Sequence, residues 1–127
     1  MSSTDHTERF VGLPRRALPG GVTVVEASTG KARRRGLSRL DSLPTDHGLR
    51  IRTVSVHTFG MRFGLDLIWL DKHDAVIRVD REVAPRRIRA CFRARSVVET
   101  LAGQGDAFLS AGVGTPASDE VERDRGA

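Results

Sequence analysis

The chain lacks several of the residues on which whole classes of small protein depend. Cys91 is its only cysteine, so neither an intrachain disulfide nor a cysteine-based zinc site can form. Tyrosine is absent, and five phenylalanines and one tryptophan are the only aromatic residues, which weakens the case for stacking on single-stranded nucleic acid. No window approaches the roughly 18 consecutive apolar residues that a membrane-spanning helix requires. These absences argue against a disulfide-rich domain, a zinc ribbon and a protein associated with a membrane.

The composition that remains is typical of one soluble globular domain. At 127 residues, with 39% apolar and 29% charged residues, the chain can bury a modest hydrophobic core, and we expect a single β domain over residues 9–113. Residues 1–8 are polar and lack the basic start and apolar run of a secretory signal, so we expect them to be disordered and the protein to be cytoplasmic. Residues 114–127 are polar and acidic without apolar periodicity, which predicts a disordered tail.

The positive charge comes almost entirely from arginine. The net charge is +5, with nineteen arginines and only two lysines. The cationic residues gather in two clusters, one formed by Lys31, Arg33, Arg34, Arg35 and Arg39 and the other by Arg86, Arg87, Arg89, Arg93 and Arg95. Such clusters attract phosphates and carboxylates, so Arg33, Arg34, Arg35, Arg86, Arg87 and Arg89 are candidate anion-binding residues for nucleic acid or an acidic partner. The alternative is that the clusters are solvated faces in a chain encoded by GC-rich DNA.

Runs of alternating or continuous apolar residues predict five or six strands. These strands cover residues 22–27, 48–54, 54–59, 65–70, 75–83 and 95–99. The spacing of Leu37, Leu40 and Leu43 indicates a short helix or helical turn after Ser28 and Thr29, and residues 103–110 could form a second short helix. No β-α-β rhythm repeats along the chain. The pattern predicts a mainly β fold, an antiparallel β-sandwich or barrel-like domain with one or two short helices.

One segment also indicates a family. Residues 56–63 read VHTFGMRF and are followed by the pairs Leu-Asp at 65–66 and 70–71, downstream of RGL at residues 35–37. This order, with Pro85 and a later stretch that keeps Glu99 and Gly103, resembles the domain of unknown function 192 family over about residues 22–111. The resemblance implies a compact, mostly β domain of bacteria and archaea with no agreed substrate, cofactor or catalytic residue. Gly64 stands where that family usually has proline.

The polar residues of this segment are the first candidates for a binding site. We expect a shallow site around His57, Met61, Arg62 and Asp66, in which Arg62 engages an anionic group. Asp66 interrupts an apolar strand, and the alternative is that it accepts backbone hydrogen bonds at the bend or pairs with Arg62 to fix the turn. On the first interpretation the protein is a binding or accessory module for a small ligand or a protein partner, with no cofactor.

Two enzyme hypotheses compete with the binding module. A zinc or manganese site could use His57, Asp66, Asp71 and Glu99, although no two of them fall at a recognised ligand spacing. Asp66 and Glu99 could instead form a catalytic carboxylate pair, with His57 beside them, if the fold brings them within about 5–9.5 Å. Nucleophilic hydrolysis is disfavoured, because the chain has neither a Gly-x-Ser-x-Gly elbow nor a phosphate-cradling glycine loop.

Overall fold

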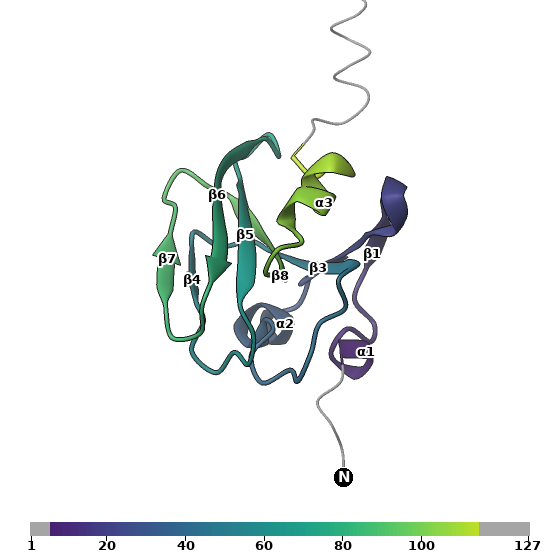
Figure 1. Cartoon of the computed structure of the whole chain (residues 1–127), viewed down its shortest axis with the longest axis vertical. Helices are drawn as coiled ribbons and strands as arrows, with labels where there is room; N and C mark the ends of the chain where they lie inside the picture. The colour runs from purple at the N-terminus through teal and green to yellow at the C-terminus, as the bar shows by residue number, and fades with distance from the viewer. Residues whose placement is uncertain (1–5, 115–127) are drawn as a thin grey trace, which may run out of the picture.

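A computed structural model describes residues 6–114, which form a six-stranded sheet, a two-stranded sheet and short helices (Figure 1). The large sheet has the strand order β1-β2-β3-β8-β5-β6, and β4 pairs with β7 in the small one. The strands are β1 (Arg15–Ala17), β2 (Thr23–Glu26), β3 (His47–Ile51), β4 (Ser55–His57), β5 (Leu65–Leu70), β6 (Val76–Val83), β7 (Ile88–Ala90) and β8 (Ser96–Leu101). The helices are α1 (His6–Arg9), the 3-10 turn η1 (Pro19–Gly21), α2 (Gly30–Arg35) and α3 (Gly105–Ser110).

The large sheet is open and mixed. Its neighbouring strands run antiparallel except β2 and β3, which pair in parallel from Thr23 opposite His47 to Glu26 opposite Arg50. A parallel pair needs a crossover connection, and here α2 lies in that connection. The prediction of a mainly β fold is confirmed. Within residues 6–114 the sheet does not close into a barrel, because β1 and β6 end the strand order without pairing with each other.

Several predicted elements differ from the observed ones in extent. The strand over residues 65–70 is observed with the predicted bounds, whereas β1 and β7, each of three residues, were not predicted. The leucines Leu37, Leu40 and Leu43 follow α2 and do not extend it, because Gly36 adopts φ +50° and ends the helix. All three leucines are buried in the turns that follow. Helix α1 begins within the segment 1–8 that was predicted to be disordered, and residues 1–5 and 115–127 lie outside the described part of the chain.

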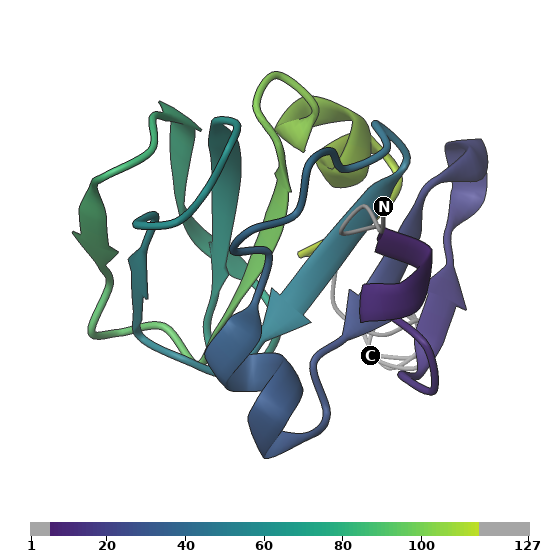
Figure 2. The same cartoon turned by 90° about the horizontal axis from the view of Figure 1, so that it is seen from below.

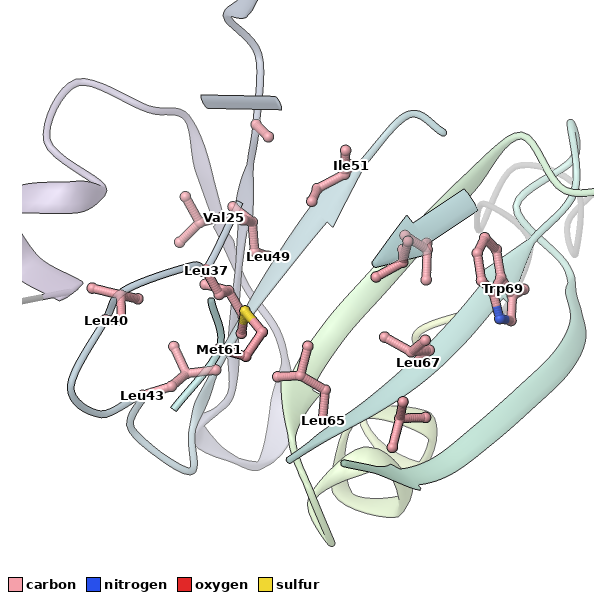
Figure 3. Close-up of a cluster of buried hydrophobic side chains, with 14 of the residues drawn as sticks. Val25, Leu37, Leu40, Leu43, Leu49, Ile51, Met61, Leu65, Leu67 and Trp69 are labelled. Carbon is pink, nitrogen blue, oxygen red and sulfur yellow. The ribbon is translucent and has the colours of Figure 1, made fainter. Parts of the chain in front are cut away.

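The sheet buries both of its faces, each against a different cover. Successive strand residues alternate between two apolar clusters: Leu65, Leu67 and Trp69 belong to the larger one, and Ile68 belongs to the smaller one with Phe108 of α3. Figure 3 shows Leu65, Leu67 and Trp69 following one another along β5 toward the larger cluster. Figures 1 and 2 show α2 and α3 on opposite sides of the sheet. Strand β8 lies between β3 and β5, and five of its six residues are buried.

The larger cluster is completed by the turns after α2 and by the β4–β7 ribbon. Leu37, Leu40 and Leu43 contribute from the turns, and Val56 contributes from β4. These segments cover the face of the sheet that carries the larger cluster. The site described below lies between them and that face. None of the helices within residues 6–114 has both the length and the apolar character needed to cross a membrane.

Candidate functional site

A pocket of about 350 Å³ opens between α2, the segment from β3 to β4, and the face of the large sheet. Its apolar walls come from the core cluster and comprise Leu37, Ile51, Val56, Met61 and Leu65. Its charged and titratable residues are Arg33, Arg34, Arg35, Arg52, His57 and Glu99. A concave site with apolar walls and a few polar groups is the usual form of a small-molecule site.

Glu99 is the polar group that this pocket buries. Its position in the middle of β8 places it opposite Leu49 of β3 and Leu67 of β5, so apolar strands flank it on both sides. The side chain is 4% exposed, and within residues 6–114 its carboxyl makes no hydrogen bond or ion pair. Burial raises the pKa of Glu99 to about 7 from its ordinary value of 4.5. The carboxyl oxygens keep a little accessible surface, which faces the pocket, and a largely buried acid without a protein partner is costly to the fold.

Gly36 makes room above this carboxyl. The residue adopts φ +50°, and a Cβ added there would lie 3.9 Å from Glu99 Oε1 and 3.7 Å from Ile51 Cδ1. The backbone around it is held on both sides, because its N–H donates to Ala32 O at 2.9 Å and its carbonyl accepts from Arg9 Nη1 at 2.9 Å. The RGL stretch singled out in the sequence therefore forms the turn that carries the chain past the carboxyl, and any larger side chain at Gly36 would project toward the pocket.

Arginines surround the opening of the pocket from two sides. Arg33, Arg34 and Arg35 belong to the last turn of α2, and the guanidinium groups of Arg33 and Arg34 extend back toward Gly30 at its start. Arg52 follows β3 and also lines the pocket. All four side chains are exposed. The ion pairs of the described residues do not include any of them, although other arginines of the fold are paired with carboxylates. We call these four residues the arginine mouth.

Two of the four residues predicted to form a binding site lie in this pocket. His57 is exposed on β4 and lines the opening, with its ring 5.9 Å from that of Phe59, and Met61 is buried in the wall. Arg62 is exposed and pairs with Asp41, and it does not line the pocket. The structure therefore brings His57 and Met61 together with Glu99, a residue predicted beside His57 only in the two enzyme hypotheses.

Asp66 lies on the other face of the sheet. Its Oδ1 accepts the backbone N–H of Glu82 at 2.8 Å, and its Oδ2 accepts the N–H groups of Gly103 and Gly105 at 3.1 and 2.8 Å. The pairing of β5 with β6 is irregular at this point, and Glu82 has φ +52°. Asp66 is 1% exposed and ties this bulge to the start of α3. It has no part in the pocket, which separates it from His57 and from Glu99.

The four residues of the metal hypothesis are dispersed. Asp66 and Asp71 stand at opposite ends of β5, and Asp71 accepts the N–H groups of His73 and Ala75 at 2.8 and 3.1 Å in a tight turn. These two backbone hydrogen bonds, from Ala75 and then His73, lower the pKa of Asp71. Within residues 6–114 no group of three or more His, Cys, Asp or Glu side chains is placed to hold a metal ion. The carboxylate pair of Asp66 and Glu99 is likewise separated by the sheet.

The second arginine cluster is on another part of the surface. Arg86 and Arg87 precede β7 and Arg89 lies within it, and none of the three lines the pocket. The backbone here is fixed by Thr58, which is 1% exposed: its hydroxyl donates to Ala84 O at 2.8 Å and accepts from Arg87 N at 2.7 Å. Sequence reasoning missed this clamp and the roles of Gly36 and Arg52. Gly36 within RGL is the sequence signal that indicates a turn there, whereas the hydrogen bonds of Thr58 join residues 26 and 29 positions apart and have no local signal.

The fold and pocket define a small, mainly β domain built on an open mixed sheet. A family model for the domain of unknown function 192 (DUF192), described as "Uncharacterized ACR", matches residues 14–115. The chain belongs to this family, which confirms the resemblance predicted from the sequence. No match was found among curated proteins.

Two solved structures share the fold. One is described as a "putative transcription regulator" from Sinorhizobium meliloti 1021; it is 20% identical, has a TM-score of 0.63, and the match covers 79% of this chain and 86% of that one. The other is a protein of unknown function from Novosphingobium aromaticivorans DSM 12444; it is 14% identical, has a TM-score of 0.60, and the match covers 77% of this chain and 88% of that one. At these identities the likeness establishes the fold alone.

Proposed function

We propose that this protein is a binding module that takes up a small molecule in the pocket above Glu99. The observation that carries the proposal is the Glu99 carboxyl itself, which is 4% exposed and lacks a protein partner within residues 6–114. A ligand that supplies a hydrogen-bond donor or a cation would compensate the cost of burying this group. The pocket volume of about 350 Å³ is within the range of metabolite-sized sites.

Binding is favoured over catalysis by what surrounds the carboxyl. The catalytic pair requires Asp66, which is on the other face of the sheet and already accepts three backbone hydrogen bonds. His57 shares the pocket with Glu99 but lies exposed at its opening. The proposal therefore includes neither a resident metal nor a reaction. The cytoplasmic location predicted from the sequence stays a prediction, to be checked by cell fractionation.

The test is a fragment screen followed by NMR on the full chain. Acids, amines and neutral compounds are added to isotope-labelled protein, and the backbone signals that move are mapped. We expect hits that shift the signals of Gly36, Ile51 and Glu99, and Glu99→Gln should weaken them by about tenfold to a hundredfold, the usual loss for a hydrogen bond to a charged group. Arg81→Gln is the matched control, because Arg81 is exposed, pairs with Asp106 and lies outside the pocket.

Two results would refute the proposed function. The first is a screen across all three chemical classes in which the pocket signals never move. The second is a set of hits that move these signals equally in the wild type and in Glu99→Gln, since the carboxyl would then have no part in recognition. A folded Glu99→Gln variant is expected, because the substitution removes a buried charge, and its spectrum verifies this before any titration.

A further inference from the structure

The charges of the pocket are separated along its depth. The arginine mouth supplies four guanidinium groups from α2 and from the segment after β3, and within residues 6–114 none of them is paired with a carboxylate. Among the lining residues that lie within positions 6–114, Glu99 alone carries a carboxyl, and it lies on the sheet at the buried end of the pocket. Within residues 6–114 no arginine lies within ion-pair distance of this carboxyl. The pocket thus offers positive charge outside and an unsatisfied acid inside.

The walls between these two ends combine apolar side chains of the core cluster with the hydroxyl-bearing residues Ser38, Thr53 and Ser55. Ile51, Met61 and Leu65 line the pocket and belong to the core cluster, and they offer no polar side-chain atom that forms strong hydrogen bonds. A ligand that reaches from the mouth to Glu99 would therefore pass apolar side chains on the side of the pocket that the core cluster forms. A chain of methylene groups fits this side of the pocket, because burying CH₂ groups against apolar side chains is favourable.

Simple ligands would leave one end of the pocket unsatisfied. A cation without an acidic group must enter past four guanidinium groups, which oppose it. An anion without a donor suits the arginine mouth but leaves the Glu99 carboxyl unpaired. A neutral apolar molecule compensates neither end. A molecule with opposite charges at its two ends compensates both, and its ammonium compensates the inner carboxylate more strongly than a neutral donor would.

We infer that the ligand of this pocket is a small zwitterion, with its acidic group on the arginine mouth, its ammonium on the Glu99 carboxylate and a hydrocarbon segment between them. This inference rests on the proposed function, that the pocket takes up a small molecule, and adds the chemical class of that molecule. Guanidinium groups bind carboxylates and phosphates through paired hydrogen bonds, so either acid suits the outer end. An ω-amino acid is the simplest molecule of this class.

Binding of such a zwitterion would release a proton from the protein. Free Glu99 is largely protonated below its pKa of about 7, and pairing with an ammonium requires the carboxylate. The other charged or titratable groups that line the pocket are Arg33, Arg34, Arg35, Arg52 and His57, and the facing residues on β3 and β5 are the apolar Leu49 and Leu67. Affinity for the zwitterion should therefore rise from about pH 5.5 to about pH 8 by roughly tenfold or more.

The experiment compares four probes of one length on the full chain: 6-aminohexanoate, hexanoate, hexylamine and 1-hexanol. Titration calorimetry and NMR shifts give the affinity of each, and 4-aminobutyrate gives a shorter zwitterion. We expect 6-aminohexanoate or its shorter relative to bind at least about tenfold more tightly than the three singly functional probes. Glu99→Gln should reduce the affinity for 6-aminohexanoate to that for hexanoate. The same affinity should fall toward that for hexylamine in two further variants, Arg52→Gln and a triple variant in which Arg33, Arg34 and Arg35 are all replaced by glutamine. Arg81→Gln is the control.

The outcomes separate this inference from the proposed function. If hexylamine binds as tightly as the zwitterion at the Glu99 pocket, or if hexanoate does, one charged end has no role and the zwitterion inference fails while the binding function stands. The same holds if none of these probes binds but fragments of another class move the pocket signals in a manner that depends on Glu99. If neither the probes nor any fragment moves those signals, both the inference and the proposed function fail.

Discussion

Replacing Glu99 with glutamine should change how the stability of the protein depends on pH. Burial raises the pKa of this carboxyl to about 7 in the folded protein, against 4.5 when it is exposed. Below the unfolded value both states hold the proton, and the residue has no net effect on the free energy of unfolding. Between the two pKa values the unfolded state has lost the Glu99 proton while the folded state still holds it. Above the folded pKa the folded state loses this proton too, and the buried carboxylate then lowers the free energy of unfolding. The unfavourable contribution of Glu99 to stability is therefore absent in acid and grows as the pH rises from about 4.5 through about 7.

The size of this effect follows from the difference between the two pKa values. One unit corresponds to roughly 1.4 kcal/mol, so Glu99 should destabilise the folded protein by about 3 kcal/mol above the folded pKa. The Glu99→Gln variant has no charge to bury and should lack this dependence. We expect the difference in unfolding free energy between variant and wild type to grow by about 3 kcal/mol, in favour of the variant, from about pH 4 to about pH 8.

Urea unfolding at several pH values measures this difference directly. Other groups titrate in the same range, but they are shared by both proteins and cancel in the comparison. Glu26→Gln is the matched control, because Glu26 is on β2 of the same sheet but pairs with Arg50 at 3.2 Å. Curves for Glu99→Gln and the wild type that stay parallel across the range would refute the reasoning. They would mean that the buried carboxyl is hydrated or paired after all.

Three further substitutions test the architecture that positions the site, each read by urea unfolding. Asp66→Ala should destabilise the protein by at least about 3 kcal/mol, because it leaves three backbone N–H groups unpaired. The control Asp41→Asn, at an exposed position, should cost less than about 1 kcal/mol. Similar losses in the two variants would contradict the role assigned to Asp66. Thr58→Val should cost about 1–3 kcal/mol by removing the acceptor of Arg87 N, and Thr58→Ser should retain most of the stability. Gly105→Ala should destabilise by more than about 1 kcal/mol, since its Cβ would lie 2.9 Å from Asp66 Oδ2, and a neutral result would be evidence against that packing.

The sequence predicted the strands that carry strong apolar patterns and missed those that do not. Residues 65–70 are almost continuously apolar, and they form β5 with the predicted bounds. Strand β1 is three residues long, fully exposed and contains two arginines, so it has no apolar alternation to detect. Its pairing depends on β2, which lies beside it in space. Such short outer strands are defined by a neighbour and not by their own residues.

The candidate site was predictable only in part, for a related reason. His57 and Met61 were singled out within one motif, and both line the pocket. Glu99 was recognised as a polar residue in a strand, but its lack of a partner depends on register: it is opposite Leu49 and Leu67, which no local pattern reveals. The role of Asp66 could not be predicted locally either, because the N–H groups that donate to it belong to residues 16, 37 and 39 positions away.

The parallel pairing of β2 with β3 has a consequence for how this domain can diversify. The chain must run from the C-terminal end of β2 back to the N-terminal end of β3, which lies at the opposite edge of the sheet. This connection consists of α2 and the turns at residues 36–46. The same connection also forms one wall of the pocket. Lengthening or shortening it would alter the shape and charge of the entrance while every strand keeps its partners, so new ligand preferences could evolve at little expense to the folded scaffold.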